Sequence, residues 1–157
     1  MKNKKEVGKA LGKVPSGLFV VTVKHGGNED AVLASWVNQC SFSPPTVSIV
    51  LAKDRPARLQ LEASGVFILN VLGKGPNGLL KHFFKPQAGE SVFTGLKTKK
   101  GFHDIRILTE AVSYLECKVL NQLPVGDHVV YVGEVVGGMV LKGGDPYTHV
   151  RGSGFNY

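Results

Sequence analysis

A chain of 157 residues is long enough to bury the core of one domain and too short for two domains of ordinary size. Apolar residues make up 43% of the chain and charged residues 20%, a balance that indicates a globular domain and excludes extensive disorder. The longest apolar runs are interrupted by Asn70, His128 or Glu134 and fall short of the about 20 residues that span a bilayer, so no membrane helix is predicted.

The net charge of +7 comes largely from two lysine-rich runs, at residues 2–5 and 97–100. Neither run is interleaved with aromatic residues, so we expect solvated basic surfaces rather than a nucleic-acid site. The same field favours a phosphate-bearing small molecule. Because the basic N-terminus lacks the apolar core of a signal peptide, the sequence predicts a cytoplasmic protein. The two cysteines, Cys40 and Cys117, predict buried free thiols.

The first part of the chain predicts one helix and three strands. Residues 4–13 indicate a short helix, and residues 1–9 a flexible or helical N-terminal arm. Residues 17–25 and 31–39 have strand-like patterns and flank the turn signal "GGNED", which predicts a hairpin. Residues 46–52 are mostly apolar and predict a third strand.

The remainder also consists mainly of strands. We expect a short helix over 55–64, a strand over 65–72 and a short helix over 77–85 capped by Asn77. Residues 87–108 read as irregular, and two long strands, 111–125 and 128–141, flank a turn. Since strands dominate without regular strand–helix alternation, the sequence predicts one domain over 1–157, an antiparallel barrel with short peripheral helices. Such barrels hold ligands at their rims.

Several familiar motifs are absent or incomplete. Gly73, Gly75 and Gly78 match G-x-G-x-x-G, but Pro76 removes an amide hydrogen from the phosphate cradle and no acidic residue follows at the required distance. A strand-to-helix turn is the better interpretation. The histidines show no metal-ligand spacing and no G-x-S-x-G elbow is present, so neither a metal site nor a serine hydrolase is predicted.

The segment "LASWVNQCSFSPP" at 33–45 is a candidate binding site. Ser35, Asn38 and Gln39 offer donors and acceptors to a flat heteroaromatic ligand, and Trp36 is suited to stack on it. The double proline would end sheet pairing where the ligand needs room. The alternative is a strand that ends in a polar bend with Trp36 in the core. From the residues alone, both interpretations remain open.

Two further segments combine a structural and a functional interpretation. Lys53 and Arg55 lie in a loop between a strand and a helix, where they are suited to hold a phosphate, although a solvated loop has the same composition. "GDH" at 126–128 is first of all a hairpin turn. His128 would nevertheless be well placed there to face a ligand at the mouth of a barrel.

The succession of "VPSGLFVVT", "LASWVNQCSFSPPTVSIVLAKDR", "FILNVL", "LECKV", "GDHVVYVGEV" and "YTHVRGSGFNY" resembles the flavin reductase-like, FMN-binding split-barrel family. It is especially similar to the C-terminal flavin reductase-like domain of the flavodiiron proteins of cyanobacteria and other phototrophs. The resemblance implies a mainly β fold, a six-stranded antiparallel split β-barrel with Greek-key connections, and a homodimer. It also implies FMN as the cofactor, with FAD as the alternative, and NAD(P)H as co-substrate.

The matching positions imply a set of site residues. Residues 34–39 match the segment that lines the isoalloxazine, which the bend at 42–45 closes. Residues 53–55 and the short helix that carries Phe83 match the parts that approach the ribityl and phosphate groups. The "GDH" turn lies near the flavin and the nicotinamide, which implies His128 as the catalytic residue. The implied cofactor-binding residues are Ala34, Ser35, Trp36, Val37, Asn38, Gln39, Lys53, Asp54, Arg55, Asn70, His82 and Asp127.

The expected function is therefore an NAD(P)H-dependent flavin oxidoreductase that passes electrons to a free flavin, an iron centre or a partner domain. Two departures keep an alternative open: Val32 and Leu33 replace a Gly-Met-Thr pattern, and Trp36 replaces a small residue. Bulk there favours a non-enzymatic FMN-binding relay module in a larger flavodiiron-type system. A basic protein that binds nucleic acid through its lysine runs is the third hypothesis.

Overall fold

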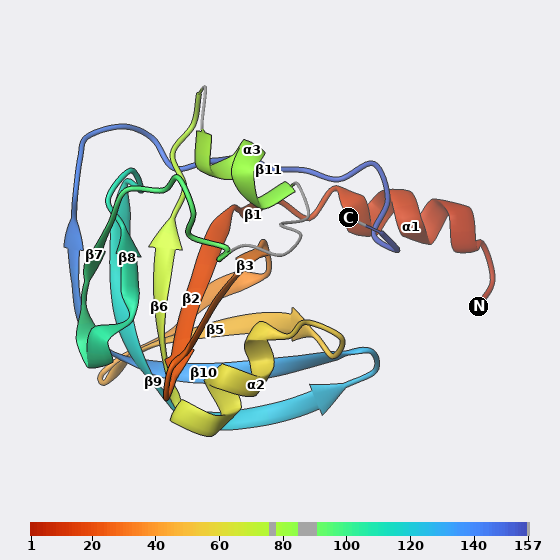
Figure 1. Ribbon diagram of the computed structural model, residues 1–157. Helices are drawn as coiled ribbons and strands as arrows, with labels where there is room; N and C mark the ends of the chain where they lie inside the picture. The colour runs from red at the N-terminus through yellow and green to blue at the C-terminus, as the bar shows by residue number, and fades with distance from the viewer. Residues whose placement is uncertain (76–77, 85–90, 157) are drawn as a thin grey trace.

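The computed structural model describes residues 1–75, 78–84 and 91–156. These residues form a mainly β fold in which one large sheet curls around a core and short helices lie outside it (Figure 1). The helices are α1 (Lys4–Gly12), α2 (Ala57–Ser64), α3 (Gly78–Phe84) and the 3-10 turn η1 (Phe102–Asp104). The strands are β1 (Ser16–Gly17), β2 (Phe19–His25), β3 (Asn28–Ala34), β4 (Val37–Phe42), β5 (Pro45–Ala52), β6 (Val66–Val71), β7 (Thr98–Lys100), β8 (Arg106–Leu108), β9 (Ser113–Val125), β10 (His128–Val140) and β11 (Thr148–His149).

The large sheet has the order β3-β2-β6-β9-β10-β5-β4, and all its neighbouring strands are antiparallel. This confirms the predicted antiparallel barrel, with seven strands in the sheet rather than six. The prediction of one strand over 31–39 is wrong, because the chain leaves β3 after Ala34 and begins β4 at Val37. The expected β2–β3 hairpin is confirmed, with a two-residue turn at Gly26 and Gly27.

The break between β3 and β4 defines the seam of the barrel. β3 and β4 are the two edge strands of the sheet, although they follow each other in the sequence. Ala34 pairs with Phe19 on β2, whereas Val37 pairs with Ile49 on β5. Between them, the Trp36 carbonyl accepts a hydrogen bond from the Val50 N–H at 3.0 Å. Ser35 and Trp36 therefore carry the chain from one edge of the sheet to the other.

The interior of the barrel is filled by side chains. Tyr131, Phe67, Ile49 and Leu61 are fully buried there, and Leu61 belongs to α2, which covers one side of the barrel (Figure 1). Each large side chain buried in this way contributes about 1.5–3 kcal/mol relative to its exposure. A ligand of this fold therefore has to bind outside the core.

A second core lies between the barrel and α3, where Leu18, Leu72, Leu79 and Phe93 are buried. The region 87–108, expected to be irregular, contributes the antiparallel pair β7–β8, so that prediction is wrong for this part. Strands of three residues are too short to produce a recognisable alternation. The helix expected over 77–85 is confirmed as α3, while its proposed cap, Asn77, lies outside the described residues.

The C-terminal segment returns along α1, which projects from the barrel (Figure 1). The Gly154 N–H donates to the Gly8 carbonyl at 2.7 Å, and the Arg151 N–H donates to the Gly12 carbonyl at 3.1 Å. A Cβ atom at Gly154 would overlap the Cβ of Leu11, so this approach requires glycine. The helix expected over 4–13 is confirmed. None of the helices in the described part of the chain is long and apolar enough to cross a membrane.

Candidate functional site

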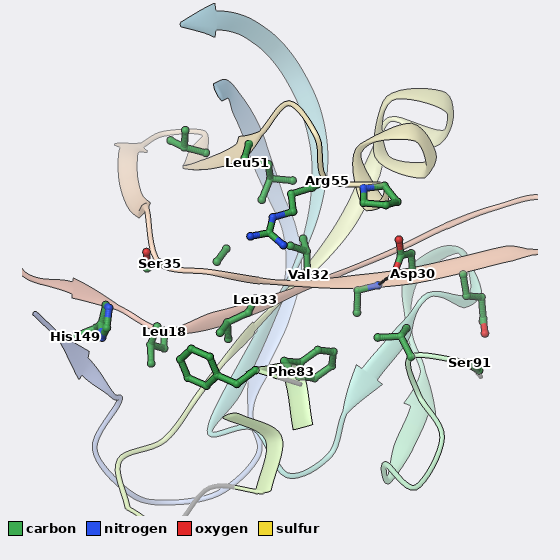
Figure 2. Close-up of a pocket in the computed structure, with 18 residues that line it drawn as sticks. Leu18, Asp30, Val32, Leu33, Ser35, Leu51, Arg55, Phe83, Ser91 and His149 are labelled. Atoms are coloured by element: carbon green, nitrogen blue, oxygen red, sulfur yellow. Dashed lines mark hydrogen bonds between the residues drawn. The ribbon is translucent and has the colours of Figure 1, made fainter. Parts of the chain in front are cut away.

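A cavity of about 750 Å³ lies beside the seam of the barrel (Figure 2). Five parts of the chain line it: Leu18 just before β2, β3 with Ser35, the end of β5 with the following loop, α3 with a nearby loop, and β11. Its size falls within the range of about 300–1,000 Å³ that is usual for ligand sites. The lining residues are Leu18, Glu29, Asp30, Ala31, Val32, Leu33, Ala34, Ser35, Val50, Leu51, Ala52, Arg55, Pro56, Phe83, Phe84, Ser91, Val92 and His149.

Much of the wall is apolar. Val32 comes from β3 and packs with Leu51 of β5, whereas Leu33 lies on the other side of β3, on which Phe83 of α3 also lies (Figure 2). β4 pairs with β5 only up to Ile49, so Leu51 and Ala52 run on past the edge strand and along the cavity. Apolar walls with an aromatic side chain suit a flat, largely apolar ring.

Ser35 supplies an unpaired polar atom. Its side chain is 6% exposed, and its Oγ has no hydrogen-bond partner among the residues that the structure describes. Leaving a buried hydroxyl without a partner costs about 1–3 kcal/mol. Since Ser35 also lines the cavity, a polar group of a bound ligand would satisfy this hydroxyl.

Charged side chains reach the cavity from two elements. Arg55 extends from the loop after β5 into the cavity (Figure 2), where its guanidinium can pair with an anionic group. Asp30 lies on β3, and burial raises the pKa of its carboxyl, although the Ala31 N–H that it accepts at 2.7 Å acts in the opposite direction. Glu29 is paired with Arg106 at 2.8 Å. Among the residues that the structure describes, Arg55 has no ion-pair partner, so its guanidinium is available for a phosphate.

The expected catalytic residue, His128, lies in a separate cluster at the same seam. Its ring centroid is 4.7 Å from that of Trp36, and the guanidinium of Arg151 lies 5.1 Å from the Trp36 ring centroid. His128 Nδ1 is 2.6 Å from an oxygen of Asp127, and this contact lowers the pKa of the Asp127 carboxyl. Trp36 therefore lies between His128 and the C-terminal segment, and neither ring lines the cavity.

Two other implied residues stabilise the fold. The Asn70 amide donates to the Val20 carbonyl at 3.0 Å and accepts from the Leu108 N–H at 2.9 Å, and its side chain is fully buried away from the cavity. His82 Nε2 donates to the Val92 carbonyl at 2.7 Å. Because Val92 and Phe83 line the cavity, His82 holds part of its wall, and His82 itself is not among the lining residues.

The remaining implied residues are dispersed. Val37 packs against the barrel core, and Asn38 and Gln39 are exposed along β4. Lys53 and Asp54 are exposed in the loop that carries Arg55. Of the implied cofactor residues, the structure thus brings Ala34, Ser35 and Arg55 together at the cavity.

The bend after β4 differs from its expected role. Phe42 pairs with Pro45, so Ser43 and Pro44 form the β4–β5 turn and Pro45 begins β5, and the double proline does not end sheet pairing beside a ligand. Cys40 is exposed, so the prediction of a buried thiol is wrong there and confirmed for Cys117. β4 is an edge strand of the sheet, so Cys40 and its polar neighbours Asn38 and Gln39 are exposed to solvent.

Sequence reasoning missed much of the cavity. Glu29 and Asp30 belong to "GGNED", which reads as a turn although only its two glycines form one. His149 comes from β11, a two-residue strand with no pattern of its own. The sequence feature that could have indicated His149 as a lining residue is the motif "YTHVRGSGFNY", which contains it. No group of three or more potential metal ligands occurs in the described ranges.

Comparison with known proteins identifies this class of fold and site. The model of the family "Flavin reductase like domain" matches residues 11–156, so the chain belongs to that family. Among curated relatives, Diflavin flavoprotein A 1 of Synechocystis sp. is 38% identical over 136 residues, which cover 85% of this chain and 24% of the relative. The chain thus spans about a quarter of the length of the curated relatives that it matches.

Solved structures agree with this assignment. The chain is similar to the NADH:FAD oxidoreductase SgcE6 of Streptomyces globisporus C-1027, with a TM-score of 0.84, 27% identity, and coverage of 95% of this chain and 90% of that one. It is also similar to the flavin reductase HpaC complexed with NADP+, with a TM-score of 0.78, 26% identity, and coverage of 90% and 89%. The split-barrel architecture is therefore established.

Proposed function

We propose that this chain is an NAD(P)H-dependent flavin oxidoreductase domain that binds FMN in the cavity at the seam. The observation that carries the proposal is the unpaired, buried Ser35 hydroxyl in an apolar cavity that also receives Arg55. A flavin has the matching parts: an apolar ring system, a polar ring edge, and a phosphate.

The residues present fit this cofactor. Ser35 would bond a polar atom of the flavin, Leu33 and Phe83 would contact its apolar surface, and Arg55 would pair with the phosphate. Asp30, a carboxylate in the same cavity, suits a hydroxyl group as partner. FMN is favoured over FAD because a terminal phosphomonoester makes the fullest use of Arg55.

When bound, the flavin supplies the redox chemistry by accepting a hydride from the nicotinamide. The protein's contribution is to orient the two rings and exclude water. We assign His128 to the nicotinamide side, since Asp127 fixes its Nδ1 and Trp36 packs on its ring. A histidine held in this way can orient an amide or stabilise negative charge on a neighbouring ring.

The test is an anaerobic visible spectrum of the protein reconstituted with FMN, recorded before and after addition of NADPH or NADH. Loss of the flavin absorption with either donor would support the proposal and identify the donor. A protein that does not bind FMN would refute it. FMN without protein, given the same donors, is the control.

A second candidate function is a flavin-binding electron relay that does not accept hydride from NAD(P)H. The position of Trp36 favours it: its ring is packed between His128 and Arg151, where a nicotinamide would need space. In that case bound FMN stays yellow with NAD(P)H. Trp36→Ser should then increase the rate of flavin reduction, measured by stopped-flow absorbance, whereas an unchanged rate would refute steric blocking by Trp36.

The partners of this domain are also part of the proposal. Several curated relatives carry the name diflavin flavoprotein and extend well beyond the length of this chain, which supports electron transfer to a partner domain or protein. Leu120, Leu123 and Val125 are exposed at the end of the β9–β10 hairpin, which supports a homodimer. The free thiols Cys40 and Cys117 fit a cytoplasmic location.

A further inference from the structure

The loop that carries Arg55 is exposed along its whole length. Residues 53–56 join β5 to α2, and each of them is exposed. An arginine on such a loop can pair with a phosphate effectively only where the loop backbone is held in place. The Arg55 N–H donates to the carbonyl of Ala52, a lining residue, at 3.1 Å, and the rest of the loop backbone is held by residues outside the cavity.

Arg58, on the first turn of α2, makes three hydrogen bonds with its guanidinium group. Nη1 donates to the Lys53 carbonyl at 2.5 Å, and Nη2 donates to a carboxylate oxygen of Glu62 at 2.7 Å. Nε donates to the hydroxyl of Tyr131 at 2.8 Å. The planar guanidinium reaches three partners at once, which the single ammonium of a lysine cannot do with the same geometry.

Tyr131 connects this group to the core of the barrel. Its side chain is fully buried, and its hydroxyl donates to Glu62 at 2.5 Å while it accepts from Arg58. Burial and the Glu62 carboxylate raise the pKa of Tyr131 to about 12, so the hydroxyl keeps its proton at neutral pH. The position of Arg58 is thereby fixed relative to β10.

The other side of Lys53 is held by the turn that precedes β10. The Lys53 N–H donates to the Asp127 carbonyl at 2.9 Å, so both backbone polar groups of Lys53 are bonded. Arg55 lies two residues further along the loop, and His128 directly follows Asp127. Lys53 therefore links the loop that enters the cavity to the turn that carries His128.

We propose that Arg58 is a positioning residue: held by Tyr131 and Glu62, it fixes the Lys53 carbonyl and so places Arg55 for the phosphate of the bound flavin. This inference rests on the proposed function, which assigns the phosphate to Arg55. Arg58 does not line the cavity, so its effect on ligand binding is exerted through the loop.

The experiment compares the affinities of FMN and riboflavin, which differ by the phosphate, for the whole chain without bound flavin. We expect Arg58→Lys to weaken the binding of FMN by about tenfold, because one charge-assisted hydrogen bond is lost. The affinity for riboflavin should change by less than about twofold. Tyr131→Phe should have the same selective effect. Tyr114→Phe, at another buried tyrosine on β9, is the matched control and should change neither affinity.

A second readout needs no flavin. Amide hydrogen exchange at Lys53 should accelerate by about tenfold in Arg58→Lys and Tyr131→Phe, and should stay unchanged in Tyr114→Phe. A wild-type preference for FMN that persists in Arg58→Lys and Tyr131→Phe, with unchanged exchange, would overturn the inference alone. If wild type and Arg55→Ala both bind FMN and riboflavin equally well, the phosphate assignment in the proposed function is wrong instead.

Discussion

Replacement of Ser35 by alanine should have opposite effects on stability and on flavin binding. In the protein without flavin, the Ser35 Oγ is buried and has no partner among the described residues, so Ser35→Ala removes a desolvated hydroxyl. A buried hydroxyl without a partner lowers the unfolding free energy by about 1–3 kcal/mol. We expect Ser35→Ala to raise the unfolding free energy by the lower end of this range, about 1 kcal/mol. For a chain of this size, that gain raises the Tm by about 2–4 °C.

With flavin, the hydroxyl gains its partner. A neutral hydrogen bond contributes about 0.5–1.5 kcal/mol, so Ser35→Ala should weaken FMN binding by about two- to twelvefold. Thermal unfolding without flavin and a fluorescence titration with FMN measure the two effects. Ser64→Ala is the control, because the Ser64 Oγ is bonded to the Val66 backbone; it should lower stability and leave FMN affinity unchanged. A Ser35→Ala protein that is less stable without flavin, or binds FMN as tightly as wild type, would refute this reasoning.

Three further predictions concern other side chains. His128→Ala should slow flavin reduction by NAD(P)H about tenfold or more while FMN affinity stays within about twofold; unchanged single-turnover rates would remove His128 from the mechanism. A thiol reagent should modify Cys40, which is exposed, and spare Cys117 until the protein is unfolded, because burial raises the pKa of the Cys117 thiol to about 12; rapid modification of both would contradict the fold. The hydrogen bond from Tyr131 lowers the pKa of Glu62 in the folded protein. The ionised Glu62 carboxylate therefore stabilises the fold at pH values above its ordinary pKa of 4.5, and this stabilisation is lost as the pH falls through the lowered pKa of the folded state. Thermal unfolding of Glu62→Gln should therefore depend less on pH in that acidic range than wild type does, and identical profiles would exclude this contribution.

The strands were largely predictable from the sequence because runs rich in apolar and β-branched residues mark them, whether continuous or interrupted by polar residues. β2, β6, β9 and β10 lie within predicted ranges, and β5 begins one residue before its predicted range. The break at Ser35 was not predictable in the same way. Residues 31–39 contain neither glycine nor proline to mark a break, whereas the change is in the pairing partner, from β2 to β5. Pairing partners far apart in the chain leave no local pattern.

The candidate site was predictable in part for a related reason. The composition of 33–45 and of the loop at Lys53 and Arg55 indicated a binding site, and the cavity does include Ser35 and Arg55. Asn70 illustrates the limit. One polar residue in an apolar run needs a partner, but the sequence does not say whether that partner is a cofactor or, as here, the Val20 and Leu108 backbone.

The location of the cavity follows from the way the sheet closes. The barrel core is filled by residues such as Tyr131 and Phe67, so the interior offers no room for a ring system of the size of a flavin. A closed sheet pairs its backbone groups with neighbouring strands, whereas a seam leaves a stretch where the wall is incomplete. Here the seam falls at Ser35 and Trp36, and the end of β5 runs past β4 beside it. The same break that ends strand pairing therefore creates the space for a ligand and buries the hydroxyl that would bind it.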